Sequence, residues 1–216
     1  TRLTVTRAVF GNKTLLVALV AGGVLRLALF SVGAHAVLAS RVEIVTPVTS
    51  IARVREGLFL LSRGVSPYAG SIFHQSPLVL LLFNALPELA WPLFFALLDC
   101  ATTLVVFGIA HIWSARAAIL AERESAINVR FHAMSLDEQA KCTRDAVPHY
   151  AVVPTLSPTT VALLFLFNPL SVVSCVAMST VGLKTFFCLA SALFALQGRV
   201  MLVALVLALG AFHSLG

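Results

Sequence analysis

RVEIVTPVTSIARVREGLFLLSRGVSPYAGSIFHQSPL, residues 41–78, is a polar segment punctuated by prolines and set between long apolar runs. Thr46-Pro47 favours a helix start, since Thr can cap free N–H groups and Pro suits the first helical position. From there apolar side chains at positions 51, 54, 58 and 61 share one face, and Gly64 can end the helix. We therefore expect an amphipathic helix over residues 47–63.

The rest of this segment predicts a turn and a second short helix. Ser66-Pro67 disfavours helix at the serine, and Gly70 permits positive φ, so residues 65–70 form a turn. Residues 78–86 are apolar apart from Asn84, but at about 1.5 Å per residue they cover roughly 14 Å, less than half of a bilayer core. We expect them to form a re-entrant or interfacial helix.

The whole composition is that of an integral membrane protein. Hydrophobic residues make up 59% of the chain, charged residues 11%, and the mean hydropathy is +0.98, against about 45–50% apolar and about 25% charged in soluble domains. Since a crossing needs roughly 20 apolar residues, we expect one all-α, polytopic transmembrane helix bundle over residues 1–216. The five predicted spans are residues 15–38, 89–113, 159–180, 183–196 and 200–215.

The basic residues predict an orientation for these five spans. With five crossings, nine Lys and Arg residues fall on one side of the membrane and five on the other. Cytoplasmic flanks of membrane spans are enriched in these residues. The N-terminus and a loop over residues 114–157, with helical tendency over 117–131, are then cytoplasmic, whereas the loop over residues 39–88 is lumenal. The net charge of +6 reflects this asymmetry, so no nucleic-acid partner is expected. The absent initiator Met and the stop inside an apolar run predict an incomplete chain.

Four polar residues in or beside the spans are candidates for chemistry. Arg26 and Asp99 lie midway along the first two spans, where a charge is costly, and they can pair between helices or contact a ligand. Glu43 and His74 flank the lumenal segment. Each can act as a general acid or base, contact a lipid headgroup, or simply be solvated or serve as a cap.

Asn168-Pro169 interrupts the third span near its lumenal end. Proline removes a helix donor and leaves carbonyl groups that other residues must satisfy, which membrane proteins tolerate beside protein or a wet cavity. Ser171, Ser174, Ser179 and Thr180 follow. Such small hydroxyl residues either pack helices closely or bind a polar ligand.

Several catalytic motifs are absent from the sequence. It has no P-loop, HExxH or GxSxG motif and no matched pair of interrupted helices. These absences argue against an ATPase, a zinc protease, a serine hydrolase and a typical secondary transporter. We expect neither a metal nor a cofactor. A transporter or channel that uses Arg26 and Asp99 as pathway residues remains a further interpretation.

Several separated motifs resemble the PIG-U family, a membrane subunit of the glycosylphosphatidylinositol (GPI) transamidase. The motifs are Arg41-Val42-Glu43, Pro47, Glu56-Gly57, Gly64-Val65-Ser66-Pro67-Tyr68, Gly70, Phe73-His74, Pro77-Leu78, Asp99 with Ala101 and Thr102, Phe167-Asn168-Pro169, Ser174-Cys175-Val176-Ala177 and Ser179-Thr180. Together they cover most of residues 41–216 outside the cytoplasmic loop.

The resemblance implies a multi-pass protein of the endoplasmic reticulum membrane, of which this chain is the N-terminal half. It implies a noncatalytic subunit that helps to bind the GPI lipid, the C-terminal attachment signal, or both, while the nucleophile belongs to a caspase-like protease of PIG-K type. Other implied partners are a PIG-T type and a metallopeptidase-like subunit. Glu43, His74 and Asn168 are the candidate contacts to the lipid headgroup. A structural or partner-contact role is expected for Arg41, Ser66, Pro67, Tyr68, Pro77, Asp99 and Pro169.

The same family is similar to the GPI mannosyltransferases, which use a lipid-linked sugar donor and have a GT-C-like scaffold. Those enzymes carry paired acidic residues in the first lumenal loop. Here Glu43 stands alone between Val42 and Ile44. A lipid-linked-sugar-dependent GPI mannosyltransferase is therefore the alternative function, and the GT-C-like scaffold is expected in either case.

Overall fold

The computed structural model describes residues 2–68, 70, 73–132 and 156–214, and within these ranges the regular structure is entirely helical. The all-α prediction is thus confirmed for the described part of the chain. The helices are α1 (Arg2–Gly11), α2 (Lys13–Ser31), α3 (Ala34–Ala39), α4 (Ile51–Ser62), α5 (Pro77–Ala85), the 3-10 turn η1 (Glu88–Ala90), α6 (Trp91–His132), α8 (Pro158–Leu166), α9 (Pro169–Val176), α10 (Val181–Leu196) and α11 (Val200–Ser214).

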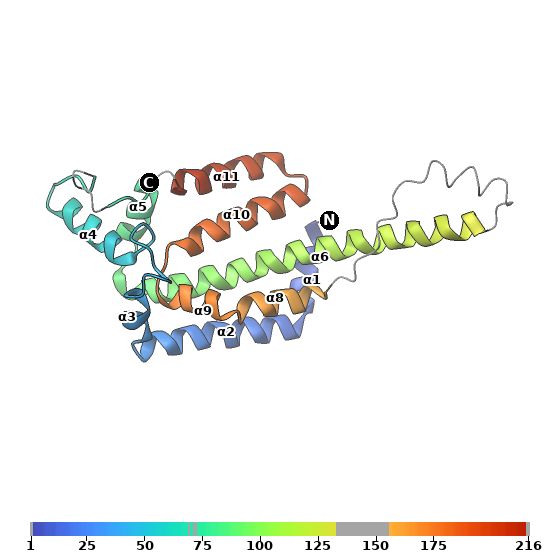
Figure 1. Cartoon of the computed structure of the whole chain (residues 1–216), viewed down its shortest axis with the longest axis horizontal. Coiled ribbons are helices and arrows are strands. Elements are labelled where there is room, and N and C mark those ends of the chain that lie inside the picture. The colour runs from blue at the N-terminus through green and yellow to red at the C-terminus, as the bar shows by residue number, and fades with distance from the viewer. Residues whose placement is uncertain (1, 69, 71–72, 133–155, 215–216) are drawn as a thin grey trace.

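The long helices run side by side along one axis of the molecule (Figure 1). Helix α6 is central, because it contacts α2, α8 and α9 on one side and α10 on the other, and α11 packs on α10. The short helices α3, α4 and α5 gather at one end of this bundle, while α6 extends beyond it at the other. We call the end formed by α3, α4 and α5 the platform.

Within the described residues, two helical segments are long and apolar enough to cross a membrane by length and composition. They are Lys13–Ser31, with 19 residues, and Glu88–Arg123, with 36 residues. Helices α8 and α9 pass the same test together, although they are bent by 47°, and would make a third span. Helices α10 and α11 are apolar but shorter. The five crossings and their orientation therefore stay predictions.

The first predicted span is interrupted, in contrast to the expected continuous run over residues 15–38. Helix α2 ends at Ser31, and α3 begins after Gly33, whose φ of +77° lies in the left-handed region. Glycine adopts this conformation without the steric cost of a Cβ. The break separates α3 from the span and places it in the platform.

The amphipathic helix begins later than the expected Thr46-Pro47 start. Residues 46–49 form a turn in which the Thr49 N–H donates to the Thr46 carbonyl, and α4 begins at Ile51, where the Ser50 hydroxyl caps the Ala52 N–H. The predicted end is confirmed. Gly64 has a φ of +71°, and the Val65 N–H donates to the Leu60 carbonyl at 3.0 Å, as in a Schellman motif.

The predicted cytoplasmic loop over residues 114–157 begins as helix. Helix α6 continues from the second span to His132 without a break, which agrees with the helical tendency of residues 117–131. Arg116 donates to the Leu196 carbonyl at 2.8 Å and so joins this helix to the end of α10. The rest of the loop, residues 133–155, lies outside the described residues.

An aromatic core attaches the platform to the bundle. The ring of Phe83 in α5 lies 5.1 Å from that of Trp91 and 5.8 Å from that of Phe95. These three side chains are buried together with Val54 of α4 and Val176 of α9. Burying a large apolar side chain contributes about 1.5–3 kcal/mol, so α5, nine residues long, is stabilised chiefly by packing against its neighbours, which include α4 and the aromatic side chains of α6.

Candidate functional site

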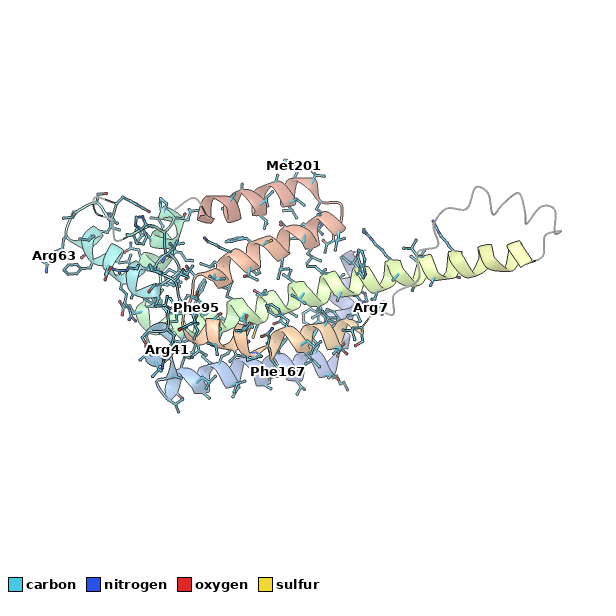
Figure 2. The ribbon with its side chains drawn as sticks, in the orientation of Figure 1. Arg7, Arg41, Arg63, Phe95, Phe167 and Met201 are labelled. Atoms are coloured by element: carbon cyan, nitrogen blue, oxygen red, sulfur yellow. The ribbon has the colours of Figure 1, made fainter. Side chains whose placement is uncertain are left out.

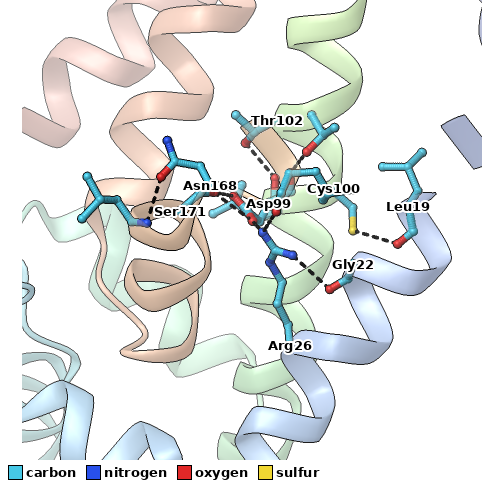
Figure 3. Close-up of polar contacts among 12 residues, drawn as sticks. Leu19, Gly22, Arg26, Asp99, Cys100, Thr102, Asn168 and Ser171 are labelled. Carbon is cyan, nitrogen blue, oxygen red and sulfur yellow. Dashed lines mark hydrogen bonds and ion pairs between the residues drawn. The ribbon is translucent and has the colours of Figure 1, made fainter. Parts of the chain in front are cut away.

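Arg26 of α2 and Asp99 of α6 form an ion pair inside the bundle, as predicted. The Arg26 side chain is fully buried, and that of Asp99 is 14% exposed. Arg26 also donates to the Gly22 carbonyl at 3.0 Å and to the Leu166 carbonyl at 2.8 Å (Figure 3). A buried guanidinium needs such partners, since an unpaired charge in an apolar interior is strongly unfavourable.

The Leu166 carbonyl is available because the helix breaks after it. In an uninterrupted helix it would accept from the N–H of residue 170, but the Leu170 N–H bonds instead to the Asn168 side chain at 2.9 Å. Asn168 is thus the N-cap of α9, and Pro169 occupies its first position. The predicted break at Asn168-Pro169 is confirmed. The break leaves the Leu166 carbonyl without a helical donor, and Arg26 donates to that carbonyl.

Ser171 of α9 is the third side chain of this network. Its contact with Asp99 was not predicted from the sequence. Its hydroxyl lies 3.0 Å from Oδ1 and 3.2 Å from Oδ2 of Asp99. The position follows from α9 starting at Pro169, which turns the third residue of the sequence Pro-Leu-Ser toward α6. The network therefore joins α2, α6, α8 and α9 through one buried, charge-balanced cluster.

The turn between α9 and α10 has an unusual residue at its centre. Met178 has a φ of +53°, and two hydrogen bonds of a Schellman motif surround it, from the Met178 N–H to the Cys175 carbonyl and from the Ser179 N–H to the Ser174 carbonyl. Glycine is usual at this position, so Met178 is in a strained conformation. The Thr180 N–H donates to the Thr49 carbonyl at 3.0 Å and attaches the turn to the segment before α4.

A cavity of about 220 Å³ opens beside this turn, between α6, the α8–α9 break and α10. Its wall mixes aromatic and aliphatic side chains with hydroxyl groups and one carboxylate. The lining residues are Phe95, Leu98, Asp99, Thr102, Phe165, Asn168, Leu170, Ser171, Ser174, Cys175, Ser179, Val181, Gly182 and Thr185. The charged network described above forms part of this wall, through Asp99 and Ser171.

The three predicted headgroup contacts do not meet in this cavity. Asn168 lines it, whereas Glu43 and His74 are exposed residues that do not. Glu43 lies in the turn after α3, and His74 lies in the segment before α5. Figure 2 shows Arg41 and Arg63 at the platform end of the molecule. The ligand-binding roles of Glu43, His74 and Asn168 stay predictions.

The motif around Ser66-Pro67-Tyr68 is organised by local contacts. The Ser66 hydroxyl accepts from the Tyr68 N–H at 3.3 Å, and the Tyr68 hydroxyl donates to the Gln75 carbonyl at 3.0 Å. Partial burial raises the pKa of Tyr68 above its ordinary value, so the phenol stays protonated and remains a donor. Pro77 begins α5. These residues shape the chain between α4 and α5.

The fold and the buried cluster define a class of protein, an all-helical bundle of membrane type with a hydroxyl-lined cavity beside an intrahelical break. Residues 20–215 match the family model described as GPI transamidase subunit PIG-U. The chain belongs to the PIG-U family.

Curated relatives agree with this assignment. The chain is 31% identical to the human GPI-anchor transamidase component PIGU over 201 residues. This alignment covers 93% of this chain and 44% of the relative. It is 32% identical over 197 residues to the Cricetulus griseus protein of the same name, covering 91% and 43%. It is 30% identical over 172 residues to the GPI transamidase component GAB1 homolog of Schizosaccharomyces pombe, covering 80% and 36%. The chain therefore spans less than half the length of these relatives.

Proposed function

We propose that this chain acts in a noncatalytic subunit of GPI transamidase that helps to bind the GPI lipid, the C-terminal attachment signal, or both. The observation that carries the proposal is the family match over residues 20–215, together with relatives named as components of that complex. The proposed location is the endoplasmic reticulum membrane, with several crossings and the platform on the lumenal side.

The proposed partners are the other transamidase subunits. They are a caspase-like protease of PIG-K type, which supplies the nucleophile, a PIG-T type subunit and a metallopeptidase-like subunit. For the Arg26–Asp99 pair a structural role is favoured over a catalytic one, because both charges are already compensated by each other, by Ser171 and by main-chain carbonyls. We assign this pair to holding the helices together.

The partner assignment is tested by affinity purification of the tagged full-length protein in mild detergent, followed by mass spectrometry. We expect a caspase-like cysteine protease and large lumenal subunits to copurify. Recovery of the protein alone, with transfer of mannose from a dolichol-phosphate donor that Glu43→Gln abolishes, would instead support the mannosyltransferase alternative.

The headgroup contacts are tested in cells that lack the endogenous subunit, with a GPI-anchored surface reporter. Joint replacement of Glu43, His74 and Asn168 by Ala is expected to lower the surface reporter while the complex still assembles. Wild-type anchoring in this triple variant would rule out the proposed contacts.

A second comparison separates ligand binding by Asn168 from its capping role. Serine is an equally good N-cap, whereas alanine is not. If Asn168→Ser restores the anchoring lost in Asn168→Ala, the side chain acts as the cap of α9. If both variants lose anchoring with the complex intact, Asn168 contacts the ligand.

A further inference from the structure

Two arginines lie together at the end of the bundle opposite the platform, where α10 turns into α11 (Figure 1). Arg116 of α6 donates to the carbonyl of Leu196, the last residue of α10, at 2.8 Å. Arg199 follows in the turn after that helix, and its guanidinium lies 5.9 Å from the centre of the Phe194 ring. Both side chains therefore flank the carboxyl end of α10, and we call them the arginine pair.

The arginine pair has no acidic partner among the described residues, because neither side chain forms an ion pair there. The sequence explains this, since residues 1–42, 100–121 and 146–216 contain no Asp or Glu, and these ranges include all of α10 and α11. A guanidinium has five N–H donors, and the bond to Leu196 leaves most of those of Arg116 uncommitted. The pair can therefore still donate several hydrogen bonds to an anion.

Counting along α6 places Arg116 at the level of lipid headgroups. Trp91, the first residue of α6, and Trp113 lie 22 positions apart. At about 1.5 Å per residue this is about 33 Å, close to the roughly 30 Å of a hydrocarbon core. Tryptophan is enriched at the boundary between hydrocarbon and headgroups, and Trp113 is exposed. Arg116 lies about one turn beyond it, at the depth of the lipid phosphates.

Exposed apolar side chains adjoin the arginine pair and select among possible anions. Val200 and Met201 directly follow Arg199 and are 76% and 84% exposed, and Trp113 lies beside Arg116 along α6. A soluble phosphate would leave these side chains in water. A phospholipid covers them with its acyl chains while its phosphate reaches the basic groups, as in other basic sites between membrane helices.

The chemistry of the arginine pair favours a lipid with a net negative charge. The planar fork of a guanidinium matches two phosphate oxygens at once, and such charge-assisted hydrogen bonds are stronger than neutral ones. A zwitterionic head carries its own cation, which competes with the arginines for the phosphate. An anionic head has no such competitor.

We propose that the arginine pair binds the phosphate of an anionic phospholipid in the leaflet opposite the platform. Arg116 and Arg199 donate to its phosphate oxygens at the end of α10, and its acyl chains lie over Trp113 and Met201. This site is separate from the cavity that Asp99 and Asn168 line, and it requires no assumption about GPI attachment.

The test uses the tagged full-length protein in phosphatidylcholine nanodiscs that contain a small fraction of phosphatidylserine with a diazirine near its glycerol end. After irradiation, mass spectrometry is expected to find the label on peptides from residues 110–120 and 193–203. Unlabelled phosphatidylserine should displace the label, whereas added phosphatidylcholine should not.

Arg199→Gln is the decisive variant, because the Arg199 side chain makes no hydrogen bond among the described residues and its loss leaves the α6–α10 bond of Arg116 in place. It should lower labelling about fivefold, the factor expected for one basic residue at a charged membrane surface. Adding Arg116→Gln should lower labelling about 25-fold if the two contributions add. Arg199→Lys keeps the charge without the fork, so its labelling should fall between those of the wild type and Arg199→Gln.

Lys13→Gln is the matched control for a diffuse effect of charge. Lys13 is exposed and begins α2, which packs on the other side of α6 from α10. A helix with its side chains is about 10–12 Å across, and exposed charges that far apart are largely screened at physiological salt. Labelling should therefore stay near the wild-type level. Thermal unfolding of each variant checks its fold, and Arg199→Gln alone carries the test if Arg116→Gln lowers the midpoint.

Three results would overturn the proposal. The first is equal labelling of the wild type and Arg199→Gln. The second is an equal loss in Lys13→Gln and Arg199→Gln, which would indicate a diffuse basic surface without a site. The third is displacement of the label by an acidic peptide such as polyglutamate but not by phosphatidylserine, which would indicate that the arginines bind a protein segment.

Discussion

Replacing Asp99 by Asn removes the charge that compensates Arg26 while changing the shape of the side chain very little. Arg26 is fully buried, and its remaining partners would be the carbonyls of Gly22 and Leu166, which carry only partial charges. Removing one partner of a buried ion pair typically costs about 3–5 kcal/mol, because the other charge is left uncompensated. Since Asn can still accept from Ser171 and Arg26, we expect a loss of about 3 kcal/mol in the free energy of unfolding.

The reverse change, Arg26→Met, has a second cost that the structure makes visible. It leaves the Asp99 carboxylate with Ser171, and it also leaves the Leu166 carbonyl without its donor at the helix break. An unsatisfied buried acceptor costs about 1–3 kcal/mol. The double variant Arg26→Met, Asp99→Asn removes both charges, so only the carbonyl penalty of about 1–3 kcal/mol should remain. The single losses should therefore exceed the double loss by at least about 3 kcal/mol in total.

The assay is reversible unfolding of the purified full-length protein in mixed micelles by titration with dodecyl sulfate, analysed as a double-mutant cycle. Glu56→Gln is the control, because Glu56 pairs with Arg53 at 2.7 Å on the exposed face of α4. Such exposed pairs contribute about 0.5 kcal/mol or less. The reasoning fails if Asp99→Asn costs no more than Glu56→Gln, or if the losses of the two single variants simply add.

Two further changes probe the packing of the bundle. Gly22→Ala is expected to destabilise the protein by about 1–3 kcal/mol, because a Cβ there would lie 2.9 Å from side-chain atoms of Leu166, which overpacks the α2–α8 contact. Its neighbour Gly23 is the control, since a Cβ there meets only a sulfur atom at 3.8 Å; equal thermal midpoints for the two alanine variants would contradict this account. Trp91→Phe should lower stability by about 2 kcal/mol through the lost indole bond to the Leu86 carbonyl at 3.1 Å and the smaller ring, and an unchanged midpoint in thermal unfolding would show that this core is not tightly packed.

Features set by a few neighbouring residues could be predicted from the sequence. The end of α4 at Gly64 and the break at Asn168-Pro169 follow from local backbone preferences, which glycine and proline impose in almost any context. The Arg26–Asp99 pair was predictable for a different reason. Two opposite charges at similar depths in apolar helices have few alternatives to each other.

Features that depend on distant segments could not be predicted. The start of α4 at Ile51 rather than Thr46 goes with the docking of the preceding turn, whose Thr49 carbonyl accepts from the N–H of Thr180, a residue far away in the sequence. The break at Gly33 was missed because the apolar run continues past it, and hydropathy does not register a single residue of positive φ. The partnership of Ser171 with Asp99 likewise needs the relative rotation of α6 and α9.

The sequence by itself determined that the chain is apolar and helical, where two of its helices end, and which family it resembles, because these properties reside in composition, local backbone preference and short motifs. The tertiary structure alone decided that Arg26, Asp99 and Ser171 meet in one buried cluster, and that Asn168 lines the cavity while Glu43 and His74 lie elsewhere. The physical reason is that burial and hydrogen bonding of a side chain depend on how separate helices pack, and many sequence neighbours of a residue are not its neighbours in space.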